Sequence, residues 1–350
     1  MIEARFLIPG DLATPTGGYV YARRLLRELP AHGVAIEGVM LPRTFPHPPA
    51  ADLTVTAAVL SATPPEAVLL VDGLAYGALP PSIIAAADTR PIVALVHHPL
   101  GYEAGLTRRR AADLVASERA ALALADRIVV TSRFTRGLLI DAFAIMAEHI
   151  VVAEPGTEQA SRAAGSGSTC VSLIAVGAVT PRKGYLDLVA ALVPLADLDW
   201  TLTIVGTLDR DHGHVATLGA AIESAGLASR ITLAGPVTAD RLAALYARAD
   251  CAVSSSHFEG YGMALAEALA RGLPIVATTG GAAGETVPNG AGLKVPPGDA
   301  TALSAALRSM IADPAGRHAA ADRSWAAAKA LPRWSDTAGI VARALKETRA

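Results

Sequence analysis

Two glutamates, Glu259 and Glu267, stand eight positions apart where an apolar stretch gives way to a helical pattern. The stretch Cys251–Val253 predicts a strand, and Glu259 follows it in a loop. Glu267 falls about two turns into a helix expected to open at Gly262 or Met263, which would point its carboxylate back into the same cleft. The Gly-Tyr-Gly turn between the glutamates lets backbone N–H groups approach an anion at the start of that helix. This arrangement indicates a cradle for a sugar nucleotide.

The residues around the two glutamates extend this pattern. Ala249-Asp250 precede the strand, Glu-Ala-Leu-Ala-x-Gly-Leu-Pro-Ile-Val-Ala-Thr starts at Glu267, and Gly280-Gly281 and Glu285 follow. The whole string resembles the E-x7-E signature of the retaining glycosyltransferases of family 4, the group 1 glycosyltransferases with the GT-B fold. Residues 290–299 resemble the hairpin and loop that follow the signature in that family. Two isolated glutamates would be read as a loop charge and a solvated helix charge, but the complete string favours the family.

Composition limits the classes of protein to which the chain can belong. A length of 350 residues predicts two domains. Charged residues and prolines interrupt every apolar stretch before the ~20 residues that a membrane span requires. The net charge is −2 and neither half has a basic surplus, which argues against nucleic acid as a partner. Cys170 and Cys251 each begin an apolar run and are predicted to be buried thiols, consistent with a reducing cytoplasm.

Short apolar runs alternate with longer helical patterns along the whole chain, which is typical of βαβ units and parallel sheets. The predicted strands are 4–8, 36–40, 67–71, 92–97, 127–131, 150–153, 171–176, 201–205, 231–234, 251–254 and 275–277, and the helices named in the first half are 19–31, 107–125 and 132–142. We therefore expect an α/β protein with two Rossmann-like, doubly wound parallel-sheet domains, which the resemblance implies face each other across a cleft. The expected boundaries are 1–157, a polar linker at 158–169, a nucleotide-sugar domain at 170–332, and a helix at 333–350 that packs back on the first domain.

Ligands of open α/β sheets bind at the carboxyl ends of the strands, so the loops there are the next candidates. Gly17 and Gly18 follow the first strand and would let the backbone approach a phosphate at a helix start. His97 and His98 follow the fourth strand, and neighbouring side chains on an extended chain point to opposite faces, so one of them is expected to enter the cleft. His97 is the better match to the family's donor-sugar histidine.

Two loops of the second half complete the candidate donor site. Arg182 and Lys183 follow the strand that ends before Gly177, and they offer a guanidinium fork and an ammonium to a diphosphate at a helix start. Many members of the family carry arginine directly after the glycine, where this chain has Ala178. Val237 follows a strand in a loop that resembles the one beside the nucleobase.

The resemblance implies a role for each of these residues in transfer of a sugar from a UDP- or GDP-sugar to a hydroxyl acceptor with retention of configuration. Glu267 would bind the ribose hydroxyls as an ionised acceptor, Arg182 and Lys183 would stabilise the departing diphosphate, and His97 would contact the sugar. Glu259 would hold the donor sugar together with Gly260, Tyr261, Gly262, Met263 and Ala264. The nucleoside-diphosphate sugar would be a co-substrate, with no metal and no further cofactor, and the acceptor would be a sugar, a lipid-linked molecule or a small molecule.

Three alternatives stay open at this point. They are a nucleotide-sugar epimerase or phosphorylase on the same fold, an NAD-dependent oxidoreductase, and a non-catalytic nucleotide-sugar-binding protein. The second lacks the Gly-x-Gly-x-x-Gly fingerprint after a first strand. The basic run Arg108–Arg110, with Arg119, predicts a solvated helix face, or else a peripheral contact with anionic lipids at the inner face of the membrane or an acidic acceptor.

Overall fold

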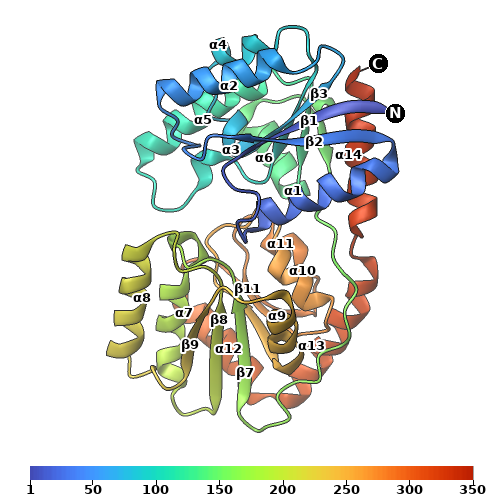
Figure 1. Cartoon of the computed structure of the whole chain (residues 1–350). Coiled ribbons are helices and arrows are strands. Elements are labelled where there is room, and N and C mark those ends of the chain that lie inside the picture. Colours follow the sequence, from blue (N-terminus) through green and yellow to red (C-terminus); the bar gives the residue numbers. More distant parts are fainter. Residues whose placement is uncertain (350) are drawn as a thin grey trace. The chain divides into compact units, whose positions relative to one another are not determined.

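The computed structural model describes residues 1–349, so that Ala350, the last residue of the expected C-terminal helix, lies outside the described residues. The chain forms two compact units, each with its own sheet (Figure 1). The first comprises residues 1–156 and is completed by the segment that begins at Pro332, and the second comprises Thr157–Leu331. Each unit is described separately below.

The first unit is built on a parallel sheet with the strand order β2-β1-β3-β4-β5-β6. Its strands are β1 (Ile2–Pro9), β2 (Val34–Leu41), β3 (Val68–Asp72), β4 (Ile92–Val96), β5 (Arg127–Val130) and β6 (Ile150–Val152). Strands β3 and β4 are buried along their whole length, as expected for strands that have helices on both faces.

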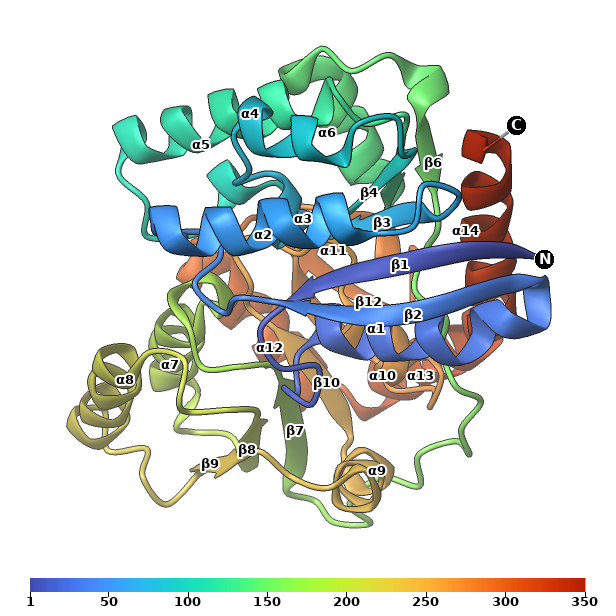
Figure 2. The same ribbon diagram turned by 45° about the horizontal axis from the view of Figure 1, so that its top comes forward.

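The helices of the first unit divide between the two faces of this sheet. They are α1 (Gly17–Glu28), α2 (Ala50–Ala62), α3 (Gly73–Tyr76), α4 (Pro81–Ile84), α5 (Arg108–Leu122), α6 (Arg133–Phe143) and α14 (Trp334–Arg349). Side chains of α2 to α6 form one apolar core with the sheet. Helix α14 packs beside α1 and against β3 to β6. Figure 2 shows α14 in red and α1 in blue.

The second unit has a parallel sheet with the order β12-β11-β10-β7-β8-β9. Its strands are β7 (Val171–Val176), β8 (Trp200–Val205), β9 (Ile231–Gly235), β10 (Cys251–Ser254), β11 (Ile275–Thr278) and β12 (Gly292–Val295). Its helices are α7 (Tyr185–Leu192), α8 (His212–Ser224), α9 (Ala239–Arg248), α10 (Met263–Leu269), α11 (Ala283–Thr286), α12 (Ala300–Ala312) and α13 (Pro314–Ala327).

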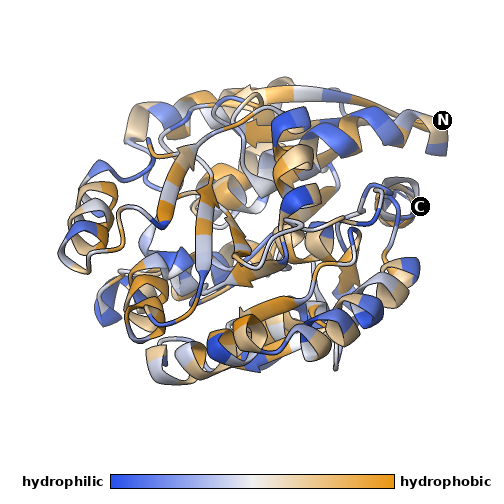
Figure 3. Cartoon of the chain, turned by 90° about the horizontal axis from the view of Figure 1, so that it is seen from below, coloured by the Kyte–Doolittle hydropathy of each residue, from blue (hydrophilic) through white to orange (hydrophobic). Residues whose placement is uncertain are grey.

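Alternate residues of β7 enter two different cores in this unit. Leu173 packs with α7, α8 and α12, whereas Ile174 packs with α9, α10 and α11. The strands are accordingly coloured mostly as hydrophobic in Figure 3, while the helices alternate between hydrophobic and hydrophilic positions. Since both faces are covered, polar side chains gather at the ends of the strands.

The order of the strands reverses between β7 and β10 in the second unit, so that consecutive connections leave in opposite directions from this point. Counted from β7, this is the doubly wound order 3-2-1-4-5-6, which places a ligand-binding crevice at the carboxyl ends of the two strands where the order reverses. The loops that follow β7 and β10 therefore meet at the expected binding position.

Three expectations from the sequence need correction. The polar segment 158–169 has no regular secondary structure but is not a free linker, because Ala163 N donates to Arg271 O and Ala164 N to Ala247 O within the second unit. Residues 290–299 do not form a hairpin, since β12 pairs in parallel with β11 across the sheet. Cys251 is buried, but Cys170 lies in the turn before β7 and is only half-buried.

Two further features bear on the expectations. Helix α2 was not among the predicted elements. Within the described residues, no helix is both long enough and apolar enough to span a bilayer.

Candidate functional site

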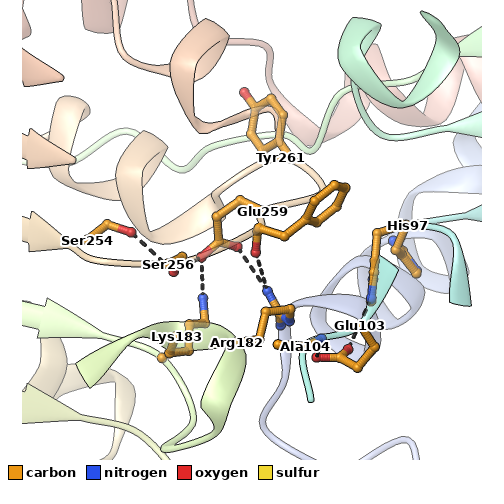
Figure 4. A network of polar contacts seen from close by, with 12 residues as sticks. His97, Glu103, Ala104, Arg182, Lys183, Ser254, Ser256, Glu259 and Tyr261 are labelled. Atoms are coloured by element: carbon orange, nitrogen blue, oxygen red, sulfur yellow. Dashed lines mark hydrogen bonds and ion pairs between the residues drawn. The ribbon is translucent and has the colours of Figure 1, made fainter. Parts of the chain in front are cut away.

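The carboxylate of Glu259 lies at the centre of a charged cluster at the carboxyl ends of β7 and β10 (Figure 4). Its Oε1 lies 2.5 Å from Lys183 Nζ and accepts a hydrogen bond of 2.6 Å from Ser256 Oγ. Its Oε2 lies 3.5 Å from Arg182 Nη1, which also donates to Phe258 O at 2.8 Å. Glu259 is only 8% exposed, so one anion and two cations share a largely desolvated site.

The two loops that carry this cluster are fastened to each other by their backbones. Residues Pro181–Lys183 form a single 3₁₀ turn that ends at Gly184, whose φ is +62°. A Cβ at Gly184 would lie 2.1 Å from Ser255 O, so the close approach requires glycine. Ser255 Oγ donates to Lys183 O at 2.9 Å, and His257 N donates to Arg182 O at 2.8 Å.

This geometry corrects the expected position of the cation pair. Arg182 and Lys183 do not open a helix, because they close the 3₁₀ turn and α7 begins only at Tyr185. The anion that compensates the two cations is the chain's own Glu259 carboxylate.

A small cavity adjoins the cluster within the second unit. Lys183, Glu259, Tyr246, Ser254 and Gly262 are among the residues that line it. The stem of Lys183 crosses closely over Gly177, where a Cβ would lie 2.7 Å from Lys183 Cε. The predicted Gly177 thus allows the ammonium group to reach the cavity.

The environment of Glu259 favours its ionised form. Burial by itself raises the pKa of the carboxyl, but the charges of Lys183 and Arg182 and the hydrogen bonds from Lys183 and Ser256 outweigh it. The pKa of Glu259 is lowered to about 2. The group is therefore an anion at every pH at which the protein would work.

Glu267 has a different environment from Glu259. Helix α10 begins at Met263, directly after Gly262 with a φ of +93°, so that Glu267 lies little more than one turn into the helix and not two as predicted. Tyr246 Oη donates to Glu267 Oε2 at 3.2 Å. Burial raises the pKa of Glu267, against the lowering effects of the Arg271 charge and the Tyr246 hydrogen bond. Glu259 lines the cavity, whereas Glu267 is not among its lining residues. That both carboxylates point into one donor-binding cleft stays a prediction.

The remaining residues of the string hold the loop in place. Glu259 N donates to Gly280 O at 3.1 Å and Glu259 O accepts from Ala282 N at 2.8 Å, which ties the loop to the segment after β11. Tyr261 is 8% exposed, and its carbonyl accepts a hydrogen bond from the Thr286 hydroxyl. Gly260 joins these residues to the start of α10, where Met263 and Ala264 form the first turn.

Val237 lies outside this cluster. It follows β9 and packs on the apolar core formed with α9 and α10, and it does not line the cavity.

In the first unit, His97 follows β4 and packs beside the start of α1. A Cβ at Gly18 would lie 3.4 Å from His97 Cδ2, and the Tyr21 ring meets the imidazole edge-on with centroids 5.3 Å apart. His97 Nε2 lies 3.6 Å from Asp72 Oδ2, beyond hydrogen-bond length. Gly17 is the first residue of α1.

His98 turns to another partner. Its Nε2 lies 3.1 Å from Glu103 Oε2, in the loop after β4. The two adjacent histidines therefore have separate environments, and His97 is the one that lies among Gly18, Tyr21 and Asp72.

The basic run Arg108–Arg110 forms the first turn of α5 and is exposed. Arg110 Nη2 lies 2.7 Å from His47 Nδ1, and Arg119 donates to Ala142 O. Arg119 is thus engaged with the neighbouring helix α6. Contact with a lipid or an acidic acceptor stays a prediction.

Several residues of the site were not predicted from the sequence. Ser256 contacts Glu259, Tyr246 contacts Glu267, and Asp72 lies beside His97. Asp72 ends β3, so the rule that located the other loops could also have located it. Tyr246 is one apolar position of a helix facing a sheet, and no local signal separates it from other core residues.

Comparisons with known proteins identify the family of this chain. The family model for glycosyl transferases group 1 matches residues 158–326. The chain is 29% identical over 240 residues to the D-inositol 3-phosphate glycosyltransferase of Kineococcus radiotolerans, an alignment covering 61% of this chain and 55% of the relative. It is 30% identical over 266 residues to the GDP-mannose-dependent α-(1-6)-phosphatidylinositol monomannoside mannosyltransferase of Mycolicibacterium smegmatis, covering 67% of each. The chain spans roughly half the length of several curated relatives that it matches.

Solved structures confirm the predicted fold. Sucrose-phosphate synthase from Thermosynechococcus elongatus has a TM-score of 0.85 at 21% identity, covering 99% of both chains. Anabaena HepE in complex with UDP-glucose has a TM-score of 0.79 at 19% identity, covering 99% of this chain and 100% of that one. At these identities the likeness shows the fold alone, which is that of the GT-B glycosyltransferases with two parallel six-stranded sheets. The family model and the Mycolicibacterium smegmatis relative, which is 30% identical over two thirds of its length, show that this chain belongs to the group 1 glycosyltransferases.

Proposed function

We propose that this chain transfers a sugar from a UDP- or GDP-linked donor to a hydroxyl group of an acceptor, with retention of the anomeric configuration. The observation that carries the proposal is the cluster of Glu259, Lys183 and Arg182 at the carboxyl ends of β7 and β10. This is the position where doubly wound sheets bind nucleotides. Two cations there suit a diphosphate, and a carboxylate beside them suits the hydroxyl groups of a sugar.

The main chemical requirement of the reaction is to stabilise negative charge on the departing nucleoside diphosphate. Lys183 Nζ and Arg182 Nη1 are held within 2.5 Å and 3.5 Å of Glu259, so both are positioned before a ligand arrives. Fixed cations in a desolvated site stabilise developing charge without having to reorganise. Glu259 then accepts hydrogen bonds from the donor sugar, and Glu267 accepts them from the ribose.

His97, Gly17 and Gly18 belong to the first unit, and we propose them as contacts for the sugar and phosphate on the basis of the resemblance. The names of two similar proteins support the donor class. The Mycolicibacterium smegmatis relative is named as GDP-mannose-dependent, and HepE was solved in complex with UDP-glucose. The proposal needs neither a metal ion nor a further cofactor.

The test is incubation of the purified chain with UDP- and GDP-sugars, with release of the nucleoside diphosphate followed by chromatography. We expect slow donor hydrolysis with at least one donor, and Glu267→Ala should weaken donor binding. Absence of binding and of nucleotide release with every donor would overturn the proposal. Retention is tested separately by NMR of the anomeric proton in the transfer product, where an inverted configuration would contradict it.

A further inference from the structure

Tyr246 lies between the cavity and the Glu267 carboxylate. Its ring lies on α9, is 1% exposed, and lines the cavity together with Lys183 and Glu259. Its hydroxyl group donates to Glu267 Oε2 at 3.2 Å and lies 3.4 Å from Ala264 O. One residue thus contacts both the cavity and the glutamate that lies outside it.

Arg271 fixes this tyrosine and the glutamate to each other. Its guanidinium lies 4.6 Å from the centroid of the Tyr246 ring, a cation–π distance. Its Nη1 also donates to Glu267 O at 2.9 Å, one turn back along the chain. The ring is therefore packed between the apolar core on α9 and a cation held at the end of α10.

The direction of the hydrogen bond is set by the protonation of the tyrosine. Burial, together with the nearby Glu267 charge, raises the pKa of Tyr246 well above its ordinary value, against the opposing charge of Arg271. The hydroxyl consequently stays protonated and acts as a donor to the carboxylate. Glu267 Oε2 is then occupied before any ligand binds, and Oε1 is the oxygen that can accept from a ligand hydroxyl.

We propose that Tyr246 is a positioning residue that holds Glu267 with one oxygen engaged and the other ready for a ribose hydroxyl, and so determines the preference for ribonucleotides over deoxyribonucleotides. The inference rests on the proposed binding of a nucleoside diphosphate. Tyr246 does not itself need to touch the ribose, because it acts through the orientation of the glutamate.

The experiment compares calorimetric affinities of UDP and GDP with those of their 2′-deoxy and 3′-deoxy forms. A hydrogen bond to a charged group contributes about 1.5 kcal/mol or more, so the wild type should prefer at least one ribonucleotide form roughly tenfold or more. Tyr246→Phe should reduce that ratio to about threefold or less. Tyr185→Phe is the matched control: it removes another buried tyrosine hydroxyl of the same unit, which donates to Gly177 O, and it should keep the ratio.

Each outcome decides the proposal. A preference that survives in Tyr246→Phe would overturn the inference alone, whereas a wild type that binds neither nucleotide would overturn the proposed function and this inference with it. Arg271→Gln is a second variant in case Tyr246→Phe does not fold, and it should also lower the ratio because the cation over the ring is lost. As the pH is lowered, the affinity of both variants for UDP or GDP should start to fall at a higher pH than that of the wild type, because Glu267 becomes protonated earlier. The physical reason is that each substitution removes an interaction that lowers the pKa of Glu267.

Discussion

Replacing Glu259 with glutamine tests how much the charged cluster contributes to stability. The change keeps the shape of the side chain but leaves Lys183 and Arg182 without their anion in a site that is largely desolvated. Removing one partner of a buried pair costs about 3–5 kcal/mol. A lowering of the pKa from 4.5 to about 2 corresponds to ~3.5 kcal/mol, at ~1.4 kcal/mol per unit. We therefore expect Glu259→Gln to lose about 3 kcal/mol at neutral pH.

This loss should appear in calorimetric melting of the whole chain. For a unit of this size, 1 kcal/mol corresponds to ~2–4 °C in Tm, so the transition of the second unit should fall by about 6–12 °C. Glu223→Gln is the control, since Glu223 is exposed on α8 and should leave the transition unchanged. Inorganic diphosphate should raise the Tm of Glu259→Gln more than that of the wild type, because it supplies the missing anion.

The pH dependence gives the same test a second form. The pKa of Glu259 is depressed in the folded state, so its contribution is complete above the unfolded value of 4.5 and is lost as the pH falls through about 2. The difference between wild type and Glu259→Gln should accordingly shrink below about pH 4.5. A variant that melts within about 1 °C of the wild type at pH 7 would refute this reasoning.

Three further changes are predicted from the same geometry. Gly184→Ala places a Cβ 2.1 Å from Ser255 O, so it should destabilise the fold by well over the ~1–2 kcal/mol that a positive φ alone costs. Gly226→Ala is the control, because Gly226 has a φ of +69° but no atom within 4 Å of the added Cβ. Thermal unfolding of the two variants compares the two costs. Lys183→Met should weaken UDP or GDP binding at least about tenfold in calorimetry, and unchanged affinity would remove Lys183 from the phosphate site. Burial raises the pKa of Glu118 to about 8, although the hydrogen bond from Leu100 N acts in the opposite direction. The protonated Glu118 side chain therefore contributes fully to stability below pH 4.5, and this contribution is lost as the pH rises to about 8. The free energy of unfolding of Glu118→Gln, measured in urea, should therefore rise relative to that of the wild type by ~1.4 kcal/mol per pH unit across that range. Stabilities of the two proteins that change in parallel with pH would contradict this prediction.

Much of the fold could be predicted because parallel strands that are covered on both faces give short apolar runs with clear ends. Strand β7 was predicted with the bounds that the structure shows, and β4 differs by one residue. Helix α2 was missed because its residues are small and apolar over much of the helix surface, so they show no helical period. Strand β12 was expected to be part of a hairpin because of the family resemblance, and its parallel pairing with β11 lies outside any local signal.

For the site, the sequence alone identified the candidate residues. The spacing of Glu259 and Glu267, the Arg182-Lys183 pair and the loops after strands were all recognisable from local patterns. The tertiary structure decided how they are paired. Lys183 and Glu259 are 76 positions apart and meet because the strand order reverses between β7 and β10, and Tyr246 reaches Glu267 only because α9 and α10 pack on the same face of the sheet. Charge compensation depends on distances through space, which residue spacing along the chain does not encode.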